Sequence, residues 1–428
     1  MGVKYKKSKY DIFLNQNIIY NLLSRSFIQV NEDLYNYLKT NNDFTVNELG
    51  NVFNKLVEYN IISQDNELSI IDYQYNRAKF AQDAASYIIY PTLLCNFDCH
   101  YCFETNKKSQ LDDNNTEILK KFLSTQAESL RELKIRWSGG EPLLVWKKIK
   151  LLTTAILENA QHLQYNFSMA TNGYYLNEIV ANELYDLHFS DLQITIDGTQ
   201  AEHNKIRFTA TDKDTYSKII DGIKIASKIM PIRIRFNVYQ ENKNSFPNFL
   251  DELEKRNVNN ENIEIFVKPI LSKQDSSCSC GLLDDKEFFE QELKLCSIAE
   301  KKGFKYSMHP NFRNDVRCLF HQTNSFVIDP DLSLYKCALD VGLKSKEVGK
   351  INSFSKIEIS DDEYIKNCLS YSPITMDECR NCKVLPICYG KCPLGQGNHY
   401  IKDKGCIPEK KSIKFKLNQF INNGIEII

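Results

Sequence analysis

Apolar and polar residues alternate in a repeating pattern between about residues 86 and 270. Six short apolar runs there have the length and composition of strands, at residues 87–94, 133–137, 166–170, 192–196, 232–238 and 263–267. The stretches between them, for example residues 115–130 and 176–187, carry apolar residues at helical spacing. Repeated strand–helix units predict an α/β fold with a parallel sheet and right-handed crossovers. Six strands favour a partial (β/α)6 TIM-like barrel over a full eight-stranded one.

Residues 1–80 have a different pattern and form a separate module in this interpretation. Residues 10–14 and 18–30 read as strands, and residues 31–38 as a short helix. Thr45 and Glu48 have the spacing of a capping box ahead of a second helix. Two apolar runs at residues 61–62 and 68–71, separated by a polar turn, predict a two-stranded wing. The whole pattern is typical of a winged-helix module, and a subdomain that only covers the barrel edge is the alternative.

The alternation of strands and helices fades from about residue 271 to residue 428, where most of the cysteines lie. Bound metal is expected to supply much of the order of this region. We therefore divide the chain into a winged-helix-like module (1–80), a barrel (86–270), and a bridging region with a cysteine-rich domain (271–428). The first part of the barrel should present its chemistry at the carboxyl ends of the strands.

Composition narrows the classes of protein that this chain resembles. Its 428 residues contain 54 lysines and arginines against 55 aspartates and glutamates, so no overall charge draws it to nucleic acid or to an anionic membrane. The N-terminus leads into no apolar signal region, and Lys6 occupies a position that a myristoylation motif reserves for serine or threonine. Without an export signal, the 14 cysteines are expected to be reduced metal ligands of a cytoplasmic protein.

Three cysteines, Cys95, Cys99 and Cys102, follow the first predicted barrel strand. Three thiolates on one loop can hold three irons of a cubane cluster and leave the fourth iron open. Zinc is the alternative, but zinc normally takes four ligands from paired spacings, and no second Cys-x2-Cys lies nearby. With the aromatic Tyr101 at its penultimate position, this motif resembles the signature of the radical S-adenosylmethionine (SAM) superfamily. That resemblance implies an open iron that chelates SAM.

Further segments at predicted strand ends resemble the SAM-binding motifs of that superfamily. They are Ser138-Gly-Gly-Glu-Pro142, Thr171-Asn-Gly173 and Thr195-Ile-Asp-Gly198 with the following Arg207. Glycines permit close backbone approach, and a carboxylate suits the cofactor's amino group. Arg207 suits a carboxylate, with a surface salt bridge as the alternative, and His203 is expected to be structural. The residues that the resemblance assigns to SAM are Gly139, Gly140, Glu141, Pro142, Asn172, Thr195, Asp197 and Arg207.

The C-terminal cysteines resemble the seven-cysteine pattern of the SPASM domain, which implies two auxiliary clusters and three [4Fe-4S] clusters in all. The resemblance assigns the distal cluster to Cys379, Cys382, Cys388 and Cys406, and the nearer one to Cys318, Cys337 and Cys392. A four-thiolate zinc knuckle is the alternative. Leu332 replaces a glycine of the pattern, which predicts a small backbone change.

The fourth ligand of the nearer cluster stays open in the sequence. Relatives that supply a cysteine have it where this chain has Phe312. The position is either left open for exchange, which we favour, or taken by Cys278, Cys280 or Cys368. Cys296, on the apolar side of a helical stretch, is expected to be an ordinary thiol.

Relatives with this architecture are expected to modify peptides or proteins. The resemblance favours a maturase that binds the leader of a ribosomally synthesised precursor through residues 1–80 and installs a crosslink, with a thioether favoured over a carbon–carbon bond. Anaerobic sulfatase maturases are the first alternative, but Ala338 stands where they carry an aspartate base and about ninety residues precede Cys95. A non-catalytic precursor-binding iron–sulfur protein is the second. The expected partners are the precursor peptide and an electron donor such as flavodoxin or ferredoxin, with no nucleic acid and no membrane.

Overall fold

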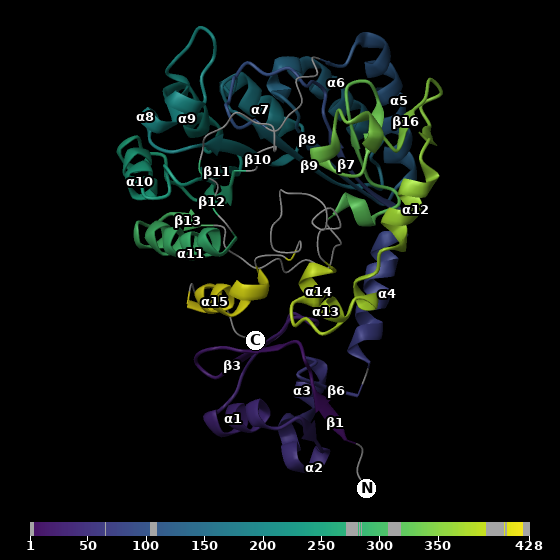
Figure 1. Ribbon diagram of the computed structural model, residues 1–428, viewed down its shortest axis with the longest axis vertical. Coiled ribbons are helices and arrows are strands. Elements are labelled where there is room, and N and C mark those ends of the chain that lie inside the picture. Colours follow the sequence, from purple (N-terminus) through teal and green to yellow (C-terminus); the bar gives the residue numbers. More distant parts are fainter. Residues whose placement is uncertain are drawn as a thin grey trace. The chain divides into compact units, whose positions relative to one another are not determined.

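The computed structural model describes residues 4–64, 66–102, 109–270, 281, 283, 285–306, 318–390, 406 and 409–422. The chain forms two compact units (Figure 1). The terminal unit comprises Met1–Phe80, Met308–Arg317 and Ser370–Ile428, and the sheet unit comprises Ala81–Ser307 and Cys318–Leu369. Each chain terminus thus belongs to the same unit. The segment 271–428, which the sequence pattern presents as one region, is divided between both units.

The sheet unit is built on a central parallel sheet. Seven parallel strands follow one another in chain order: β7 (Ala84–Ile89), β8 (Glu132–Trp137), β9 (Gln164–Thr171), β10 (Phe189–Ile196), β11 (Ile232–Val238), β12 (Ile263–Pro269) and β13 (Lys305–Tyr306). All six strands expected from the sequence are present, and the first begins and ends earlier than expected. The predicted α/β class with a parallel sheet is confirmed.

Helices cover the outer side of this sheet (Figure 1). They are α5 (Asp113–Ser129), α6 (Trp146–Leu157), α7 (Glu178–Asp186), α8 (Gln200–Ile206), α9 (Thr215–Ala226), α10 (Phe246–Lys255) and α11 (Asp285–Lys301). The strands alternate in burial: in β11, Ile232, Ile234 and Phe236 are fully buried while Arg233 and Arg235 are only partly so. Because side chains point to opposite faces in turn, one face of the sheet packs against helices and the other carries polar groups.

An antiparallel extension completes the sheet beyond β7. Strand β14 (Phe326–Ile328) pairs in parallel with β7, and β15 (Ser333–Tyr335), β16 (Gly349–Ile351) and β17 (Ile357–Ile359) follow as antiparallel neighbours. Helix α12 (Asp362–Ser370) comes next in the chain. Cys318 and Cys337 therefore belong to the part of this sheet that lies beyond β7, which is the strand that precedes the first cysteine loop.

The N-terminal part of the terminal unit contains two small antiparallel sheets and short helices. One sheet joins β1 (Tyr5–Lys7), β5 (Asp43–Phe44) and β6 (Ile62–Ser63), and the other joins β2 (Asp11–Phe13), β3 (Ile18–Asn21) and β4 (Phe27–Gln29). The helices are α1 (Glu32–Thr40), α2 (Val46–Leu49), α3 (Phe53–Glu58) and α4 (Glu67–Lys79). The predicted capping box is present, since Glu48 accepts hydrogen bonds from the backbone N–H and hydroxyl of Thr45, both at 2.7 Å.

The predicted two-stranded wing is wrong in its second half. Residues 68–71 belong to α4, which continues to Lys79. Ile71 and Tyr75 lie one helical turn apart, are fully buried, and pack into the hydrophobic core of the terminal unit. This tertiary burial of one helical face outweighs the local strand-like appearance of the short apolar run.

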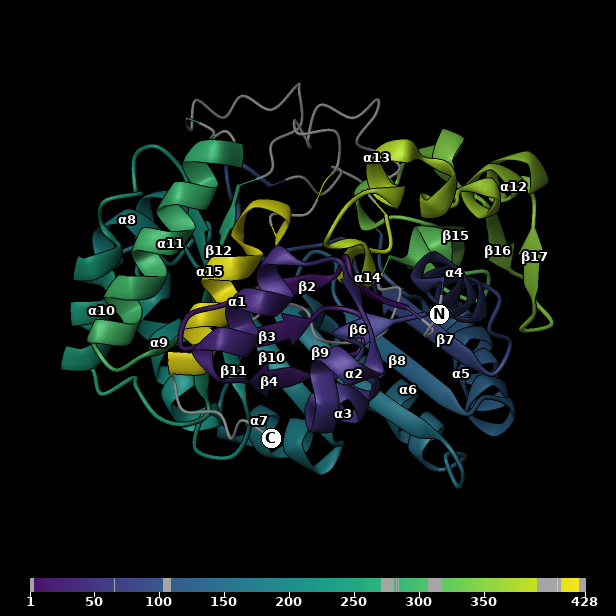
Figure 2. The ribbon, with the colours of Figure 1, turned by 90° about the horizontal axis from the view of Figure 1, so that it is seen from below.

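Both ends of the chain contribute to one hydrophobic core of the terminal unit. Residues of β2, β3 and α4, among them Tyr20 and Tyr75, pack with residues of α13 (Asp377–Arg380), α14 (Leu385–Cys388) and α15 (Glu409–Asn422), among them Leu385 and Leu417. Helix α15 lies beside β3 in both views of the ribbon (Figures 1 and 2). The rings of Tyr75 and Tyr389 stack at a centroid distance of 6.4 Å. The N-terminal module thus shares this core with the C-terminal helices, and has a second core of its own that includes Leu38, Phe53 and Leu56.

No helix in the described residues has the length and apolar character needed to cross a membrane.

Candidate functional site

The first cysteine loop leaves the carboxyl end of β7 and brings Cys95, Cys99 and Cys102 together. The Cys102 N–H donates to the Cys99 carbonyl at 3.0 Å, which closes the loop into a tight turn. Burial raises the pKa of Cys99 to about 12, and the neighbouring charges of Cys102 and Cys95 act in the same direction. Binding of a metal cluster must therefore release the proton of Cys99.

Two glycines after β8 support the backbone that leads into this loop. Gly139 has a φ of +112°, and a Cβ there would stand 2.4 Å from the Thr92 carbonyl oxygen. A Cβ on Gly140 would stand 2.2 Å from the Leu94 carbonyl oxygen. The Gly140 N–H donates to Thr92 at 3.0 Å, and the next N–H donates to Leu94 at 2.9 Å. The close approach that glycine permits is thus made to the protein's own loop.

Glu141 is fully buried, and both of its carboxylate oxygens are engaged within the protein. Oε1 accepts from the Thr171 hydroxyl at 2.6 Å and the Leu143 N–H at 2.9 Å, and Oε2 accepts from the Asn172 N–H at 2.7 Å. Burial raises the pKa of Glu141, while these hydrogen bonds favour the ionised form. Glu141 caps the short 3₁₀ helix that begins at Pro142, which is buried. Its contact with the amino group of a cofactor stays a prediction.

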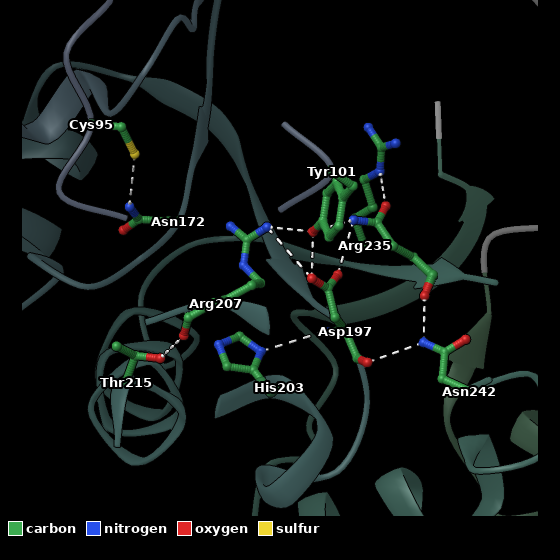
Figure 3. Close-up of polar contacts among 10 residues, drawn as sticks. Cys95, Tyr101, Asn172, Asp197, His203, Arg207, Thr215, Arg235 and Asn242 are labelled. Carbon is green, nitrogen blue, oxygen red and sulfur yellow. Dashed lines mark hydrogen bonds and ion pairs between the residues drawn. The ribbon is translucent and has the colours of Figure 1, made fainter. Parts of the chain in front are cut away.

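Asn172, at the end of β9, joins the neighbouring strand end to the cysteine loop. Its amide donates to Asn96 Oδ1 at 2.8 Å and approaches the Cys95 sulfur at 3.9 Å (Figure 3). Asn172 is 5% exposed, whereas Cys95 is exposed. The structure therefore brings Asn172 and Cys95 together, as the motif positions suggested.

Tyr101 connects the same loop to the end of β10. Its hydroxyl donates to Asp197 Oδ2 and accepts from Arg207 Nη1 at 2.7 Å (Figure 3). Arg207 and Asp197 also form an ion pair at 3.7 Å, with Asp197 fully buried. Burial alone would lower the pKa of Arg207, but the acidic groups around it, Cys99 first, raise it well above the usual value. Arg207 is thus a fixed buried cation, which excludes the surface salt bridge considered from the sequence.

Strand β11 adds polar groups that sequence reasoning missed. Asn237 donates to the Tyr101 hydroxyl at 3.0 Å and to Asp197 Oδ1 at 2.9 Å, and Arg235 donates to Asn237 at 2.8 Å. Asn242 donates to the Asp197 carbonyl oxygen at 3.0 Å. The alternating polar positions 233, 235 and 237 within an otherwise apolar strand were the signal that could have found them.

The remaining predicted residues of the barrel lie close to this network. Thr195 is partly buried on β10, two residues before Asp197. His203 is fully buried, and its Nδ1 accepts from the Asp197 N–H at 3.4 Å. Burial and the positive charge of Arg207 lower the pKa of His203 well below its usual value, so the imidazole is neutral. This agrees with a structural role for His203.

Cys318 and Cys337 lie on the antiparallel extension, at the starts of two short 3₁₀ helices. Cys368, on α12, is fully buried, and burial raises the pKa of its thiol to about 12. Cys368 interacts electrostatically with Lys336 and Cys318. Of the three thiols considered as a fourth ligand, Cys368 is thus brought near Cys318, and Cys278, Cys280 and Phe312 lie outside the described residues.

The turn before β15 keeps its shape without the glycine of the pattern. Leu332 has a φ of +63°, in the left-handed region that glycine favours. Its N–H donates to the Asp329 carbonyl at 2.9 Å. The small backbone change expected from the sequence stays a prediction. The buried side chain of Leu332, 2% exposed, offsets a conformational cost of roughly 1–2 kcal/mol.

The four cysteines assigned to a distal cluster line one cavity in the terminal unit. The lining residues are Glu378, Cys379, Cys382, Val384, Leu385, Cys388, Gly390, Cys406 and Lys410. Lys410 Nζ lies 3.7 Å from the Cys406 sulfur, and the charge of Cys406 raises the pKa of Lys410. We call this the distal-cysteine cavity. Cys392, assigned to the nearer cluster, lies outside the described residues.

The donor sets fit iron–sulfur clusters by their chemistry. The first cysteine loop offers three soft thiols and the distal-cysteine cavity four, and the cavity is also lined by the apolar side chains of Val384 and Leu385. Within the part of the chain that the structure describes, no three cysteine, histidine or acidic side chains converge closely enough to hold a single metal ion. In a cluster, each thiolate binds a separate iron. Cys296, expected to be an ordinary thiol, is buried in α11 and lies 3.6 Å from Glu300 Oε1.

Comparison with known proteins gives a family for the sheet unit. The family model described as the Radical SAM superfamily matches residues 89–253. The cysteine-type anaerobic sulfatase-maturating enzyme of Clostridium novyi (strain NT) is 24% identical over 325 residues, which cover 70% of this chain and 84% of that protein.

Two solved structures share the fold at low identity. Native anSMEcpe with bound AdoMet has a TM-score of 0.61 and 18% identity, and covers 80% of this chain and all of that chain. Streptococcus suis SuiB bound to precursor peptide SuiA has a TM-score of 0.54 and 13% identity, and covers 94% of this chain and all of that chain.

Proposed function

We propose that this chain, which is a radical SAM superfamily enzyme, is a peptide maturase that binds a ribosomally made precursor through residues 1–80 and installs a crosslink in it. The favoured product is a thioether, and a carbon–carbon bond is the second choice. The SAM-binding residues and the two auxiliary clusters assigned from the sequence are part of this proposal. A flavodoxin or ferredoxin supplies the electrons.

The observation that carries the proposal is the extent of the fold likeness to the peptide-bound SuiB structure. That likeness leaves out 6% of the 428 residues, or about 26, which is fewer than the 80 of the N-terminal module. The shared fold therefore extends into residues 1–80. A module that a peptide maturase also possesses is best explained by peptide recognition.

The outer edge of β4 is our proposed binding site for the leader. Strand β4 pairs only with β3 among the described strands, at the register Ile19 to Ile28. The Asn21 N–H donates to Ser26 and the Val30 N–H donates to Asn17, so alternate residues of β4 bond to β3. By this alternation the backbone N–H groups of Phe27 and Gln29 point away from β3. An extended peptide can add to them as a further strand.

The residues around the first cysteine loop would hold the cluster and bind SAM. When bound, the cluster and SAM supply a 5′-deoxyadenosyl radical that removes a hydrogen atom from the peptide. Cys95, Cys99 and Cys102 would hold the cluster and leave one iron open. Glu141 holds the ends of β8 and β9 together, and Arg207 presents a buried positive charge that suits the cofactor's carboxylate.

The thioether preference rests on the nearer cluster site. Cys318, Cys337 and Cys392 provide three thiolates, and a cysteine of the substrate would be the fourth. Cys368 is the competitor for that position, since it interacts with Cys318. Replacement of Cys368 by alanine should leave thioether formation intact if the substrate thiol is the ligand. If Cys368→Ala instead loses the iron at this site, Cys368 is the fourth ligand.

The test uses the anaerobically reconstituted full chain with SAM, dithionite and a precursor peptide. Alanine at Cys95, Cys99 and Cys102 should abolish release of 5′-deoxyadenosine. Gln29→Pro removes one outward N–H and should reduce peptide modification, measured by mass spectrometry, while 5′-deoxyadenosine release without peptide is kept. Gln29→Ala, which keeps that N–H, is the matched control. Equal peptide modification by both Gln29 variants would contradict leader binding at β4.

Formylglycine formation is the second candidate, favoured by the match to 84% of the C. novyi enzyme. Ala338 provides no base, but Asp340 lies two residues further, is 5% exposed, and has a pKa raised by burial. A peptide with a sulfatase-type cysteine should gain formylglycine if this candidate is right. Asp340→Asn should then abolish the reaction, which the maturase proposal does not require.

A further inference from the structure

We propose that Tyr101 is a positioning residue of this enzyme, whose hydroxyl holds Arg207 and Asp197 against the cysteine loop so that the guanidinium faces the cluster thiols before SAM binds. Tyr101 lies between two cluster cysteines in sequence, yet its side chain is 8% exposed and reaches the ends of two strands. The inference concerns the SAM site of the sheet unit and does not depend on the identity of the substrate.

The hydroxyl of Tyr101 has its full complement of hydrogen bonds. It donates to Asp197 and accepts from Arg207 at 2.7 Å and Asn237 at 3.0 Å (Figure 3). One donor and two acceptor positions are all that a phenol offers. A fully satisfied buried hydroxyl specifies one arrangement of its neighbours.

The segment after α8 is fastened to the cysteine loop at further points. The Asp98 N–H donates to the Phe208 carbonyl at 3.2 Å, and the rings of His100 and Phe208 meet edge to face at 5.8 Å. The Arg207 guanidinium lies over the Phe97 ring at 5.6 Å. Arg207 is therefore fixed from two sides by residues of the loop that carries the thiols.

The held position of Arg207 lets its charge act on the site. Its positive charge acts on Cys95, Cys99 and Glu141, which belong to two different strand ends. Nη1 is committed to Tyr101, whereas the buried Nε has no hydrogen-bond partner among the described residues. The guanidinium thus retains hydrogen-bonding capacity for an anionic group brought by SAM.

The hydroxyl bridges Arg207 and Asp197 and keeps their ion pair from becoming shorter. Their charged atoms are 3.7 Å apart, and the phenol oxygen bonds to both. With phenylalanine at position 101, Asp197 loses a donor, and the nearest replacement is the guanidinium. Closure of the ion pair would turn Arg207 away from the thiols while the aromatic packing is kept.

The test is a SAM titration of the reduced first cluster, followed by electron paramagnetic resonance. Tyr101→Phe should retain the iron and sulfide content of the wild type but require about tenfold more SAM for half of the SAM-induced spectral change. Tyr174→Phe is the matched control, because the Tyr174 hydroxyl donates to Asp212 at 2.8 Å away from Arg207. The control should titrate as the wild type does.

A second variant separates positioning from general damage to the loop. Asp197→Asn should weaken the titration to a similar extent, and the double variant should be no weaker than either single one, because the residues act through one contact. Unchanged midpoints for Tyr101→Phe, or additive losses in the double variant, would overturn the proposal. Loss of the first cluster's iron in Tyr101→Phe would also overturn it, since the hydroxyl would then act on cluster binding.

Discussion

The first cysteine loop and the distal-cysteine cavity hold the same type of donor by different means. Polar groups at strand ends fix the first: Asn172 meets Cys95, and Tyr101 meets Asp197. Apolar packing fixes the second, where Cys379 belongs to a hydrophobic core. A loop held by hydrogen bonds can keep one iron open to a ligand, whereas a cavity with four thiols suits a cluster that is part of the fold.

The two regions also differ in how far apart their parts lie in the sequence. The first loop is supported by the strand ends of one unit, each reached by a short loop from its own strand. The core at the distal-cysteine cavity combines Tyr10 to Leu23 with residues beyond position 370. The Asn15 N–H donates a hydrogen bond to Asn418 Oδ1, in the same distant region, at 3.0 Å. A substitution that weakens the packing of one of these segments should therefore also destabilise the other.

Deletion of residues 1–80 should break this comparison most strongly. If residues 1–80 were only a separate recognition module, as the sequence pattern predicts, the deletion would spare 5′-deoxyadenosine release and weaken only peptide modification. The shared core predicts that it also removes the apolar partners of Leu385 and Leu417, and with them the iron that we propose for the distal-cysteine cavity. Iron and sulfide analysis after reconstitution measures the loss. Gln29→Pro, on the edge of β4, is the control that should keep all of the iron.

The reverse change tests the same link from the other side. Cys382→Ala with Cys388→Ala should reduce hydrogen-exchange protection in residues 10–23, because both side chains pack on that core. Protection of strands β8–β11 should stay as in the wild type. Unchanged protection of residues 10–23 in the variant would show that the N-terminal module folds independently of the cavity.

Gly140→Ala should sharpen the comparison by damaging only the first loop. The added Cβ would meet the backbone of Leu94 at 2.2 Å, and backbone atoms on both sides cannot move aside easily. We expect a loss of about 1–3 kcal/mol in stability of the sheet unit and reduced iron at the first site. Gly303→Ala is the control, since nothing lies within 4 Å of its Cβ and only its positive φ is strained. Equal effects of both variants in denaturant unfolding and iron analysis would contradict the close contact.

Sequence reasoning succeeded where the signal is local. The strand at Ile232–Val238 has the predicted bounds because its alternation is uninterrupted, and the Thr45–Glu48 capping box needs only four residues. The spacing of Cys95, Cys99 and Cys102 located the first loop for the same reason. What failed depends on tertiary contacts: α4 forms because Ile71 and Tyr75 find a core.

The parts of the site that the sequence did not reveal are those that bond across the sheet. The motif placed Glu141 at the cofactor, but its oxygens are used by the next strand end. The aromatic character of Tyr101 was visible, whereas its hydroxyl acts only because Asn237 and Arg207 come from distant segments. Neither spacing nor composition records such pairings. No local sequence pattern indicates that segments near both ends of the chain belong to one unit.

A buried carboxyl in the terminal unit gives the smallest expected effect and the one that depends on pH. Asp11, on β2, is 1% exposed; its Oδ1 accepts from Asn21 at 2.8 Å, and its Oδ2 has no hydrogen-bond partner in the described part of the chain. Burial raises the pKa of Asp11 well above the ordinary value of 3.8; Glu67 adds to the shift, and Lys383 and Lys7 oppose it. The folded state thus holds this proton more tightly than the unfolded state does.

Stability of the terminal unit should therefore fall as the pH rises from about 4 through the folded pKa of Asp11, and stay level above it. Asp11→Asn keeps an oxygen for Asn21 and removes the ionisation, so it should be more stable than the wild type by roughly 1 kcal/mol above that range. Denaturant unfolding between pH 5 and pH 8 measures the difference. Asp43→Asn, at an exposed position, is the control and should keep the pH dependence of the wild type, because it leaves Asp11 in place. If the stability of the wild type instead rises with pH relative to that of Asp11→Asn, Lys7 and Lys383 must stabilise the Asp11 carboxylate. Charged groups would then stabilise the terminal unit as they do the first cysteine loop.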